Sequence, residues 1–220
     1  MTFKDSGVKA IFVIQLITLI LVVIILLNNL SVSGPVAASS QPVEARISVN
    51  NHAIEVDSKN DYTFGNPHAK NFLIVYSNYH CDYCHYFYTH VFDSLYTPYV
   101  LTGKLKIICK SLVDSTDNKG LMMAKIAEVG RQTSHFIEIH KLLLHSSESI
   151  DSTEIIGLGL KAGISEVEIK ARFNSEETIS KIKSDNLSAK ELNIKGTPSF
   201  VLNGTVHLGY MTYEDIASKL

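Results

Sequence analysis

Two of the three cysteines in this chain are two residues apart, in the stretch HCDYCH at His80–His85. An apolar run rich in β-forming residues, Phe72–Tyr76, precedes them and predicts a buried strand. Apolar residues then recur at helical spacing, at Phe87, Val91, Phe92 and Leu95. A Cys-x-x-Cys pair between a strand and a helix is typical of redox-active thiols. At a helix start the first thiol can face solvent as a stabilised thiolate, while the second points back at it.

Composition restricts the remaining classes of function. The chain has 220 residues, a length that suits one medium domain with an appendage. The net charge of −2 and a pI near 6.5 leave no basic field for nucleic acid. Three cysteines are too few for a structural disulfide framework.

The N-terminal segment differs from the rest of the chain. Residues 10–27 carry no charge and form an apolar run just long enough to cross a bilayer. Two lysines precede this run, and the next charge after it is Glu44. The positive-inside bias therefore predicts a cytoplasmic segment 1–9, a transmembrane anchor at 10–30 and an extracytoplasmic remainder.

A cleaved signal peptide is the alternative for this segment, with Val36–Ala38 as a cleavage site of small residues. The anchor is favoured because the apolar run is longer than in most signal peptides and Ala38 lies far beyond it. Both interpretations send the following domain to an oxidising space such as the periplasm.

The next elements predict an α/β domain at 46–220, after a linker at 31–45 that is rich in Ser, Gly, Pro and Ala. Residues 46–49 and 53–56 alternate, as a hairpin or one broken strand would. A second strand at 104–111 completes a βαβ unit with parallel pairing. This strand contains Cys109, which we interpret as a buried free thiol.

The second half of the chain predicts a helical insertion at about 113–193, with Ser152 capping its third helix and His140 as a satisfied core histidine. Asn203-Gly204 between two β-forming runs then signals a hairpin. A last helix at 213–220 follows, capped by Thr212.

These features together resemble the DsbA-like branch of the thioredoxin-like disulfide oxidoreductases, over roughly residues 52–220. The resemblance depends on Phe64–Pro67, the Cys81–Cys84 centre, the helical block and Gly196–Phe200. It implies a thioredoxin-like fold with Pro198 as a cis-proline that follows Thr197 and faces the cysteines. It also implies that Cys81 is the nucleophile, that Cys84 resolves the mixed disulfide, and that no cofactor is needed.

The same resemblance implies cysteine-containing protein substrates and a membrane or periplasmic redox partner. We expect a monomer, because no dimerisation domain is evident. Three positions depart from the usual pattern: Val75 and Asn78 replace acidic residues, and Asp82 replaces a proline. We expect Asp82 to disfavour the Cys81 thiolate.

Other residues near the pair have less certain roles. His80 and His85 would favour the thiolate if protonated, and with Tyr83 and Asp82 they form the predicted set of redox-tuning residues. Four aromatic residues are interpreted as core or peptide-contact surface, with core favoured: Tyr79, Tyr83, Tyr86 and Phe87.

Several alternatives remain open. An oxidant, an isomerase and a reductase would share this motif, and a redox-inactive binding module is disfavoured only because both cysteines are intact. Cys81-x-x-Cys84-His85 also matches the c-type haem attachment pattern, with His85 as axial ligand. The buried strand before the motif and the later hairpin argue against haem. A zinc site fails because adjacent residues cannot easily converge on one ion.

Overall fold

The computed structural model describes residues 44–49, 52–57, 60–147 and 149–220. It begins with an antiparallel hairpin of β1 (Glu44–Val49) and β2 (His52–Asp57), which confirms the hairpin alternative. β1 starts within the predicted linker, so the boundary at residue 45 was wrong by two residues. The predicted anchor at 10–30 lies outside the described residues. Within them, no helix combines the length and apolar character needed to cross a membrane.

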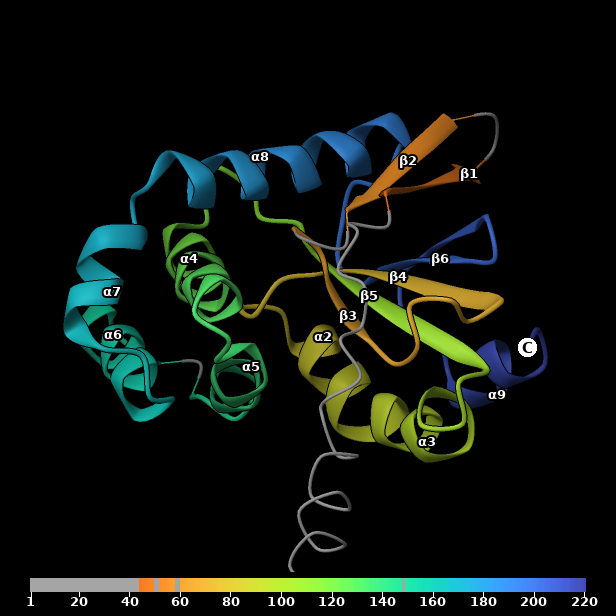
Figure 1. Ribbon diagram of the computed structural model, residues 1–220, viewed down its shortest axis with the longest axis horizontal. Coiled ribbons are helices and arrows are strands. Elements are labelled where there is room, and N and C mark those ends of the chain that lie inside the picture. The colour runs from red at the N-terminus through yellow and green to blue at the C-terminus, as the bar shows by residue number, and fades with distance from the viewer. Residues whose placement is uncertain (1–43, 50–51, 58–59, 148) are drawn as a thin grey trace, which may run out of the picture. The chain divides into compact units, whose positions relative to one another are not determined.

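A five-stranded sheet in the order β3-β5-β4-β6-β7 forms the centre of the domain (Figure 1). The strands are β3 (Tyr62–Phe64), β4 (Asn71–Ser77), β5 (Leu105–Ser111), β6 (Ser199–Leu202) and β7 (Thr205–Leu208). β4 and β5 pair in parallel, which confirms the βαβ unit, and the other neighbours pair antiparallel. The β6–β7 hairpin is also confirmed, since Asn203 and Gly204 have the positive φ angles of a tight turn, 49° and 88°.

The helical segment after β4 is continuous but irregular. It runs through α2 (Asp82–Tyr86), the π-helical η1 (Phe87–Phe92), α3 (Asp93–Leu95) and the π-helical η2 (Tyr96–Val100). Proline usually interrupts a helix, but this helix continues past Pro98. Pro98 has no N–H to donate, and the π turn instead closes with the Leu101 N–H donating to the Tyr96 carbonyl at 2.9 Å.

The predicted helical insertion is present and holds five helices between residues 118 and 191. They are α4 (Asn118–Gln132), α5 (Phe136–Leu144), α6 (Ser152–Lys161), α7 (Glu166–Arg172) and α8 (Glu176–Glu191). Asp151, not Ser152, caps α6, because its carboxylate accepts from the amides of Thr153 and Glu154. Thr212 caps α9 (Tyr213–Ala217) as expected, although this helix ends three residues before the predicted end.

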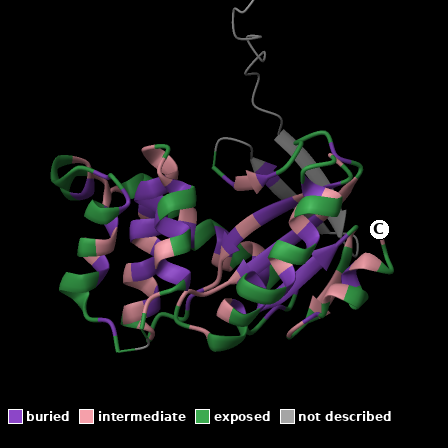
Figure 2. Ribbon diagram, turned by 90° about the horizontal axis from the view of Figure 1, so that it is seen from below, coloured by how far each residue is buried: buried purple, intermediate pink, exposed green. Residues whose placement is uncertain are grey.

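The two faces of the sheet bury separate apolar clusters, as the alternation of side chains along a strand requires. Leu73 and Val75 of β4 pack with Phe87 and its neighbours in the cysteine helix, in the cluster that extends into the insertion. Ile74 and Tyr76 face the opposite way, toward the end of α8. Figure 1 shows α8 and α2 on opposite sides of the sheet, and Figure 2 shows buried residues both in the strands and in the helices of the insertion.

The turn before β4 requires glycine. Gly65 has a φ of 91°, and a side-chain Cβ there would lie 2.8 Å from the Leu105 carbonyl oxygen and 2.9 Å from the Val100 side chain. This close approach brings the loop from β3 against the start of β5.

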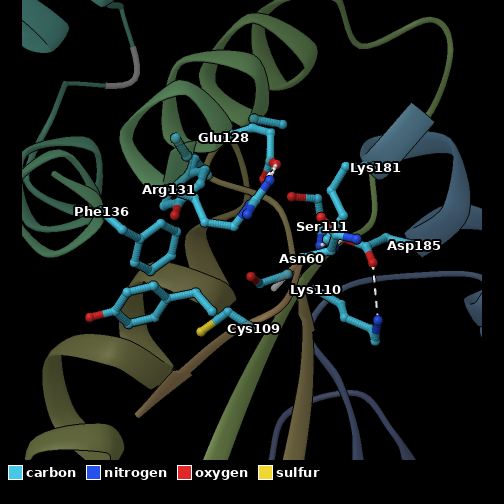
Figure 3. Close-up of a pocket in the computed structure, with 14 residues that line it drawn as sticks. Asn60, Cys109, Lys110, Ser111, Glu128, Arg131, Phe136, Lys181 and Asp185 are labelled. Atoms are coloured by element: carbon cyan, nitrogen blue, oxygen red, sulfur yellow. Dashed lines mark hydrogen bonds and ion pairs between the residues drawn. The ribbon is translucent and has the colours of Figure 1, made fainter. Parts of the chain in front are cut away.

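A buried ion cluster connects the sheet to the insertion. The Lys110 ammonium in β5 lies 2.8 Å from the Asp61 carboxylate. It also lies 3.2 Å from Asp185 in α8 (Figure 3). Lys181 is 2.6 Å from Asp185 and 3.1 Å from Asp61, so two cations alternate with two anions. Burial would raise the pKa of Asp61, but Lys181 and Lys110 outweigh burial and lower it. Buried charges are tolerated when paired in this way.

Lys110→Met should therefore destabilise the domain by about 3–5 kcal/mol, because it leaves two buried carboxylates to share one cation. Urea unfolding measures the change. Lys170→Met is the matched control, since Lys170 is exposed and makes only a surface pair with Glu166 at 3.6 Å. Equal stability of the two variants would contradict this account of the cluster.

Candidate active site

The cysteine pair lies where the sheet passes into the first helix. β4 ends at Ser77, and after a short turn Cys81 takes the N-cap position of α2 with an extended backbone. Cys81 is partly exposed, whereas Cys84, one turn into the helix, has 1% of its surface exposed. The apolar strand and the helix that packs on it thus place one sulfur outside the core and the other inside it.

The loop before β6 faces the exposed sulfur. The Thr197–Pro198 bond is cis, as the sequence resemblance implied. The Cys81 sulfur lies 3.4 Å from the Thr197 carbonyl oxygen, to which it donates when it is protonated. Pro198 has no N–H, so it donates no backbone hydrogen bond at this position.

A groove of about 440 Å³ borders this loop. Its lining comes from the end of the insertion and the β6–β7 hairpin: Asn193, Lys195, Gly196, Thr197, Pro198, Ser199, Leu208 and Gly209. Leu208 is 68% exposed, so the groove offers an apolar contact close to the cis bond.

The two sulfurs have opposite acidities. A hydrogen bond from the Cys84 thiol lowers the pKa of Cys81 from 9.0 to about 5, against the effect of burial. The Thr197 side chain and the amides of Cys84 and Tyr83 add to this stabilisation of the thiolate. The pKa of Cys84 is raised far above its ordinary value, because its proton bonds to Cys81 and because it is buried. Cys81 is therefore the thiolate at neutral pH, and Cys84 holds the proton.

The predicted tuning residues lie around the pair but have different partners. The His85 ring bonds through Nε2 to the Tyr79 carbonyl oxygen, and His80 bonds through Nδ1 to Asp117 at 2.9 Å. Asp82 lies in the first turn of α2, where a carboxylate suits the helix dipole. The largest contributions that lower the Cys81 pKa come from Cys84 and Thr197, which were not in the predicted set of redox-tuning residues.

The aromatic residues near the pair divide between core and surface. Phe87 is fully buried, but Tyr83 is 67% and Tyr86 50% exposed, so for these two the favoured core assignment was wrong. Both lie in the short α2, which begins directly after Cys81. The Tyr86 ring stacks on His90 with centroids 4.2 Å apart and meets Tyr210 edge-on, which forms an aromatic surface there.

His140 is buried, as expected, but only one of its ring nitrogens has a partner. Nδ1 lies 2.6 Å from the Tyr79 hydroxyl, while Nε2 has no hydrogen-bond partner among the described residues. Burial lowers the pKa of His140 to about 3, so the ring is neutral. Because burial also raises the pKa of Tyr79, its hydroxyl is the donor in this bond.

Cys109 is a free cysteine in β5, half-buried beside a cavity of about 30 Å³, which is room for about one water molecule (Figure 3). Its sulfur lies 3.6 Å from the Tyr88 hydroxyl. Burial raises the pKa of this thiol to about 12, so it stays protonated and unreactive.

Two site residues were missed by the sequence reasoning. Asn78 was noted only as a departure from the family pattern, and Asp117 was given no role. Asp117 is the N-cap of α4, and it reaches back to the cysteine turn through Asn78 and His80. An acidic residue before a helical pattern was a capping signal, but nothing local indicated its distant partners. In the described part of the chain, no group of three or more His, Cys, Asp or Glu side chains is arranged to hold a metal ion.

A family model described as thioredoxin matches residues 57–220. The chain belongs to this thioredoxin family. Among curated proteins, it is 28% identical over 151 residues to a Rickettsia typhi protein named as a protein-disulfide oxidoreductase, which covers 66% of this chain. A Rickettsia conorii protein of the same description is 26% identical over 199 residues, covering 88% of this chain and 70% of that protein. The chain spans only 55% of the length of the Rickettsia typhi relative.

Solved structures give the same fold. A thioredoxin-like oxidoreductase from Silicibacter pomeroyi has a TM-score of 0.66 and 18% identity, covering 73% of this chain and 90% of that one. Wolbachia pipientis alpha-DsbA1 has a TM-score of 0.65 and 22% identity, covering 72% and 88%. The predicted DsbA-like thioredoxin fold with a helical insertion is thereby confirmed.

The acidities of the two sulfurs lead to a pH test. Alkylation of Cys81 in the reduced protein should follow a thiolate with a midpoint near pH 5 instead of 9. Cys84→Ala removes the largest contribution that lowers the pKa, so the midpoint should move up by more than about one unit. Rates measured across the pH range by mass spectrometry give the midpoint, with Cys109→Ala as the control that should leave it unchanged.

The low pKa of Cys81 also determines whether the stability of the reduced protein rises or falls with pH. The pKa of Cys81 is lower in the folded reduced protein than in the unfolded chain. Folding therefore gains stability as pH rises from about 5, and the gain is complete above about 9. The oxidised protein has no thiolate, so its melting temperature should lack this rise. Parallel pH curves for the two redox forms would contradict the assignment.

Proposed function

We propose that this chain is a thiol–disulfide oxidoreductase that exchanges disulfides with cysteine-containing proteins outside the cytoplasm. One observation carries the proposal: the half-exposed Cys81 is a stabilised thiolate, and the buried Cys84 holds the proton one helical turn away. This difference assigns attack and release to Cys81 and resolution to Cys84. The names of the Rickettsia relatives support the same class of reaction.

In the oxidised protein, a substrate thiolate attacks the Cys81 sulfur. The Cys81–Cys84 bond breaks, a mixed disulfide forms, and Cys84 leaves as a thiolate that takes a proton. A second thiolate of the substrate then attacks its own sulfur in the mixed disulfide. The substrate gains a disulfide, and Cys81 leaves as a thiolate that Cys84, Thr197 and the helix amides stabilise.

This stabilisation favours the disulfide-donating direction. A low pKa makes Cys81 a good leaving group in the last step and lowers the free energy of the reduced form, which makes the oxidised form a stronger oxidant. An isomerase or reductase of the same fold is the alternative, and it would use the same two sulfurs.

The other two alternatives fit the site less well. Haem attachment would bind both sulfurs, yet Cys84 is enclosed and the His85 Nε2 is occupied by the Tyr79 carbonyl. A redox-inactive binding module would not need the opposite acidities of the two cysteines.

The substrate surface in this proposal consists of the groove beside Pro198 and the exposed rings of Tyr83 and Tyr86. An extended peptide could pair with the backbone next to Pro198 while its side chains contact these rings. A membrane or periplasmic redox partner would return Cys81 and Cys84 to the disulfide.

Substitution of each cysteine tests the chemistry. Cys81→Ser should abolish oxidative refolding of a reduced secreted protein, because the attacked sulfur is lost. Cys84→Ser should instead accumulate mixed disulfides when the Cys81 thiolate attacks a substrate disulfide, since Cys84 is no longer present to resolve them. Cys109→Ser is the control and should keep full activity. Equal alkylation of Cys81 and Cys84 in the native reduced protein would refute the assigned roles.

The proposed location follows from the apolar run at 10–27. The full chain should fractionate with membranes and resist extraction by salt and carbonate, because a span of this length inserts almost irreversibly. Protease added to intact spheroplasts should degrade the catalytic domain and spare a cytoplasmic tag on residue 1. A mature chain that starts near Ser39 would establish cleavage and contradict the anchor.

A further inference from the structure

The carboxylate of Asp117 binds three donors at the start of the insertion. It accepts from the Asn78 side-chain amide at 2.8 Å, from the His80 ring at 2.9 Å and from the Gly120 backbone amide at 2.9 Å. Only the last bond is a helix cap. The other two cross 37 to 39 residues of sequence to the turn that precedes Cys81.

That turn is itself closed by Asn78. The Asn78 side-chain oxygen accepts from the His80 amide at 2.9 Å, and its carbonyl accepts from the Cys81 amide at 3.2 Å. The Asn78 backbone N–H also bonds to the Cys84 sulfur. Asn78 therefore contacts both cysteines through its backbone, while its side chain is held by Asp117.

Gly120 lies so close to the Asp117 carboxylate that a side chain at residue 120 would collide with it. A Cβ on Gly120 would lie 2.1 Å from Asp117 Oδ2 and 2.6 Å from the Asn78 side-chain oxygen. A real side chain at this position would have to displace one of the two. The absence of a side chain at residue 120 is thus a condition for the contact between the insertion and the cysteine turn.

Asp117 is ionised at neutral pH. Burial would raise its pKa, but the hydrogen bonds from Asn78, the Gly120 amide and His80 outweigh burial and lower it. A carboxylate accepts several bonds at once without donating any, which is what three converging donors require.

We propose that Asp117 is a positioning residue for thiol exchange: from the insertion, it holds Asn78 and His80 and so fixes the turn that presents Cys81 beside the Cys84 thiol. The role rests on the function proposed above and acts through neighbours, because no hydrogen bond joins Asp117 to either sulfur in the described structure. The charged and titratable groups around this turn are Asp82 and His85 in α2, His80 in the turn, and Asp114 and Asp117 before α4.

A serine at position 117 separates capping from positioning. Asp117→Ser keeps an oxygen for the Gly120 amide, because serine is a good N-cap, but has no second oxygen to bind Asn78 and His80 together. The melting temperature should fall by only a few degrees. The alkylation rate of Cys81 near pH 6 should fall at least about threefold and its midpoint should rise by about half a unit, since the donors to the thiolate lose their alignment.

A reciprocal exchange tests whether the hydrogen bonds are the cause. In Asn78→Asp/Asp117→Asn, the carboxylate and the amide change places, so the bond between the two side chains can form again with the same total charge. This variant should return the alkylation rate to within about twofold of wild type, while Asp117→Asn alone should stay slow. Failure of the folded exchange variant to recover would overturn the proposal.

A substitution away from the carboxylate gives an independent test. Gly120→Ala should slow Cys81 as Asp117→Ser does, because the methyl group displaces the carboxylate. Gly157→Ala in α6 is the matched control, since a Cβ there meets nothing within 4 Å. The proposal would be refuted if the alkylation rate of Cys81 were unchanged in Asp117→Ser and Gly120→Ala, or if its pH midpoint fell. Asp117 would then act only through its charge or as a helix cap.

The failure of this inference can be told apart from failure of the proposed function. Alkylation reports on Cys81 in every variant without any protein substrate. A wild-type chain that exchanges no disulfide with glutathione would refute the proposed function. Wild-type exchange together with unaltered thiol reactivity in the folded Asp117 and Gly120 variants would refute only the role of Asp117.

Discussion

The chemistry of this protein depends on one hydrogen bond, in which the buried Cys84 thiol donates to the half-exposed Cys81 sulfur. The bond requires that one sulfur be close to solvent and the other inside the core, only a helical turn apart. β4 and the cysteine helix satisfy this requirement because the chain leaves the buried strand and enters the helix within four residues. The buried Cys84 thiol therefore sets the pKa of the Cys81 sulfur, which lies close to solvent.

Much of this arrangement could be predicted from local sequence. An apolar run predicted β4, alternation at 104–111 predicted β5, and Asn203-Gly204 predicted the last hairpin. Rules based on the local sequence failed at positions where the surrounding structure overrode them. Pro98 did not end its helix, because a π turn moved the hydrogen bond past the missing N–H. Tyr83 and Tyr86 were assigned to the core, although the short α2 turns them outward.

The remaining site residues could not be predicted because their partners are far away in sequence. Asp117 has the ordinary appearance of a helix cap, and its second role exists only because α4 begins next to the cysteine turn. The ion cluster is a similar case, since Asp61, Lys110 and Asp185 come from a loop, a strand and a helix. Polar pairs of this kind have no periodicity in sequence, and only the fold brings them together.

The two polar contacts also restrict how the insertion can move. Its first helix is attached at Asp117 to the cysteine turn, and its last helix is attached through Lys181 and Asp185 to Lys110 in the sheet. A hinge at the α8 end would separate charges that are buried and paired, which is costly, and a hinge at the α4 end would break the hydrogen bonds of Asp117 to Asn78 and His80. The five-helix segment is therefore attached at one end to the cysteine turn and at the other end to the sheet. For the proposed disulfide exchange, protein substrates of different shape would then have to be accommodated by exposed side chains such as Tyr83 and Tyr86, because the backbone of the cysteine turn is held in place.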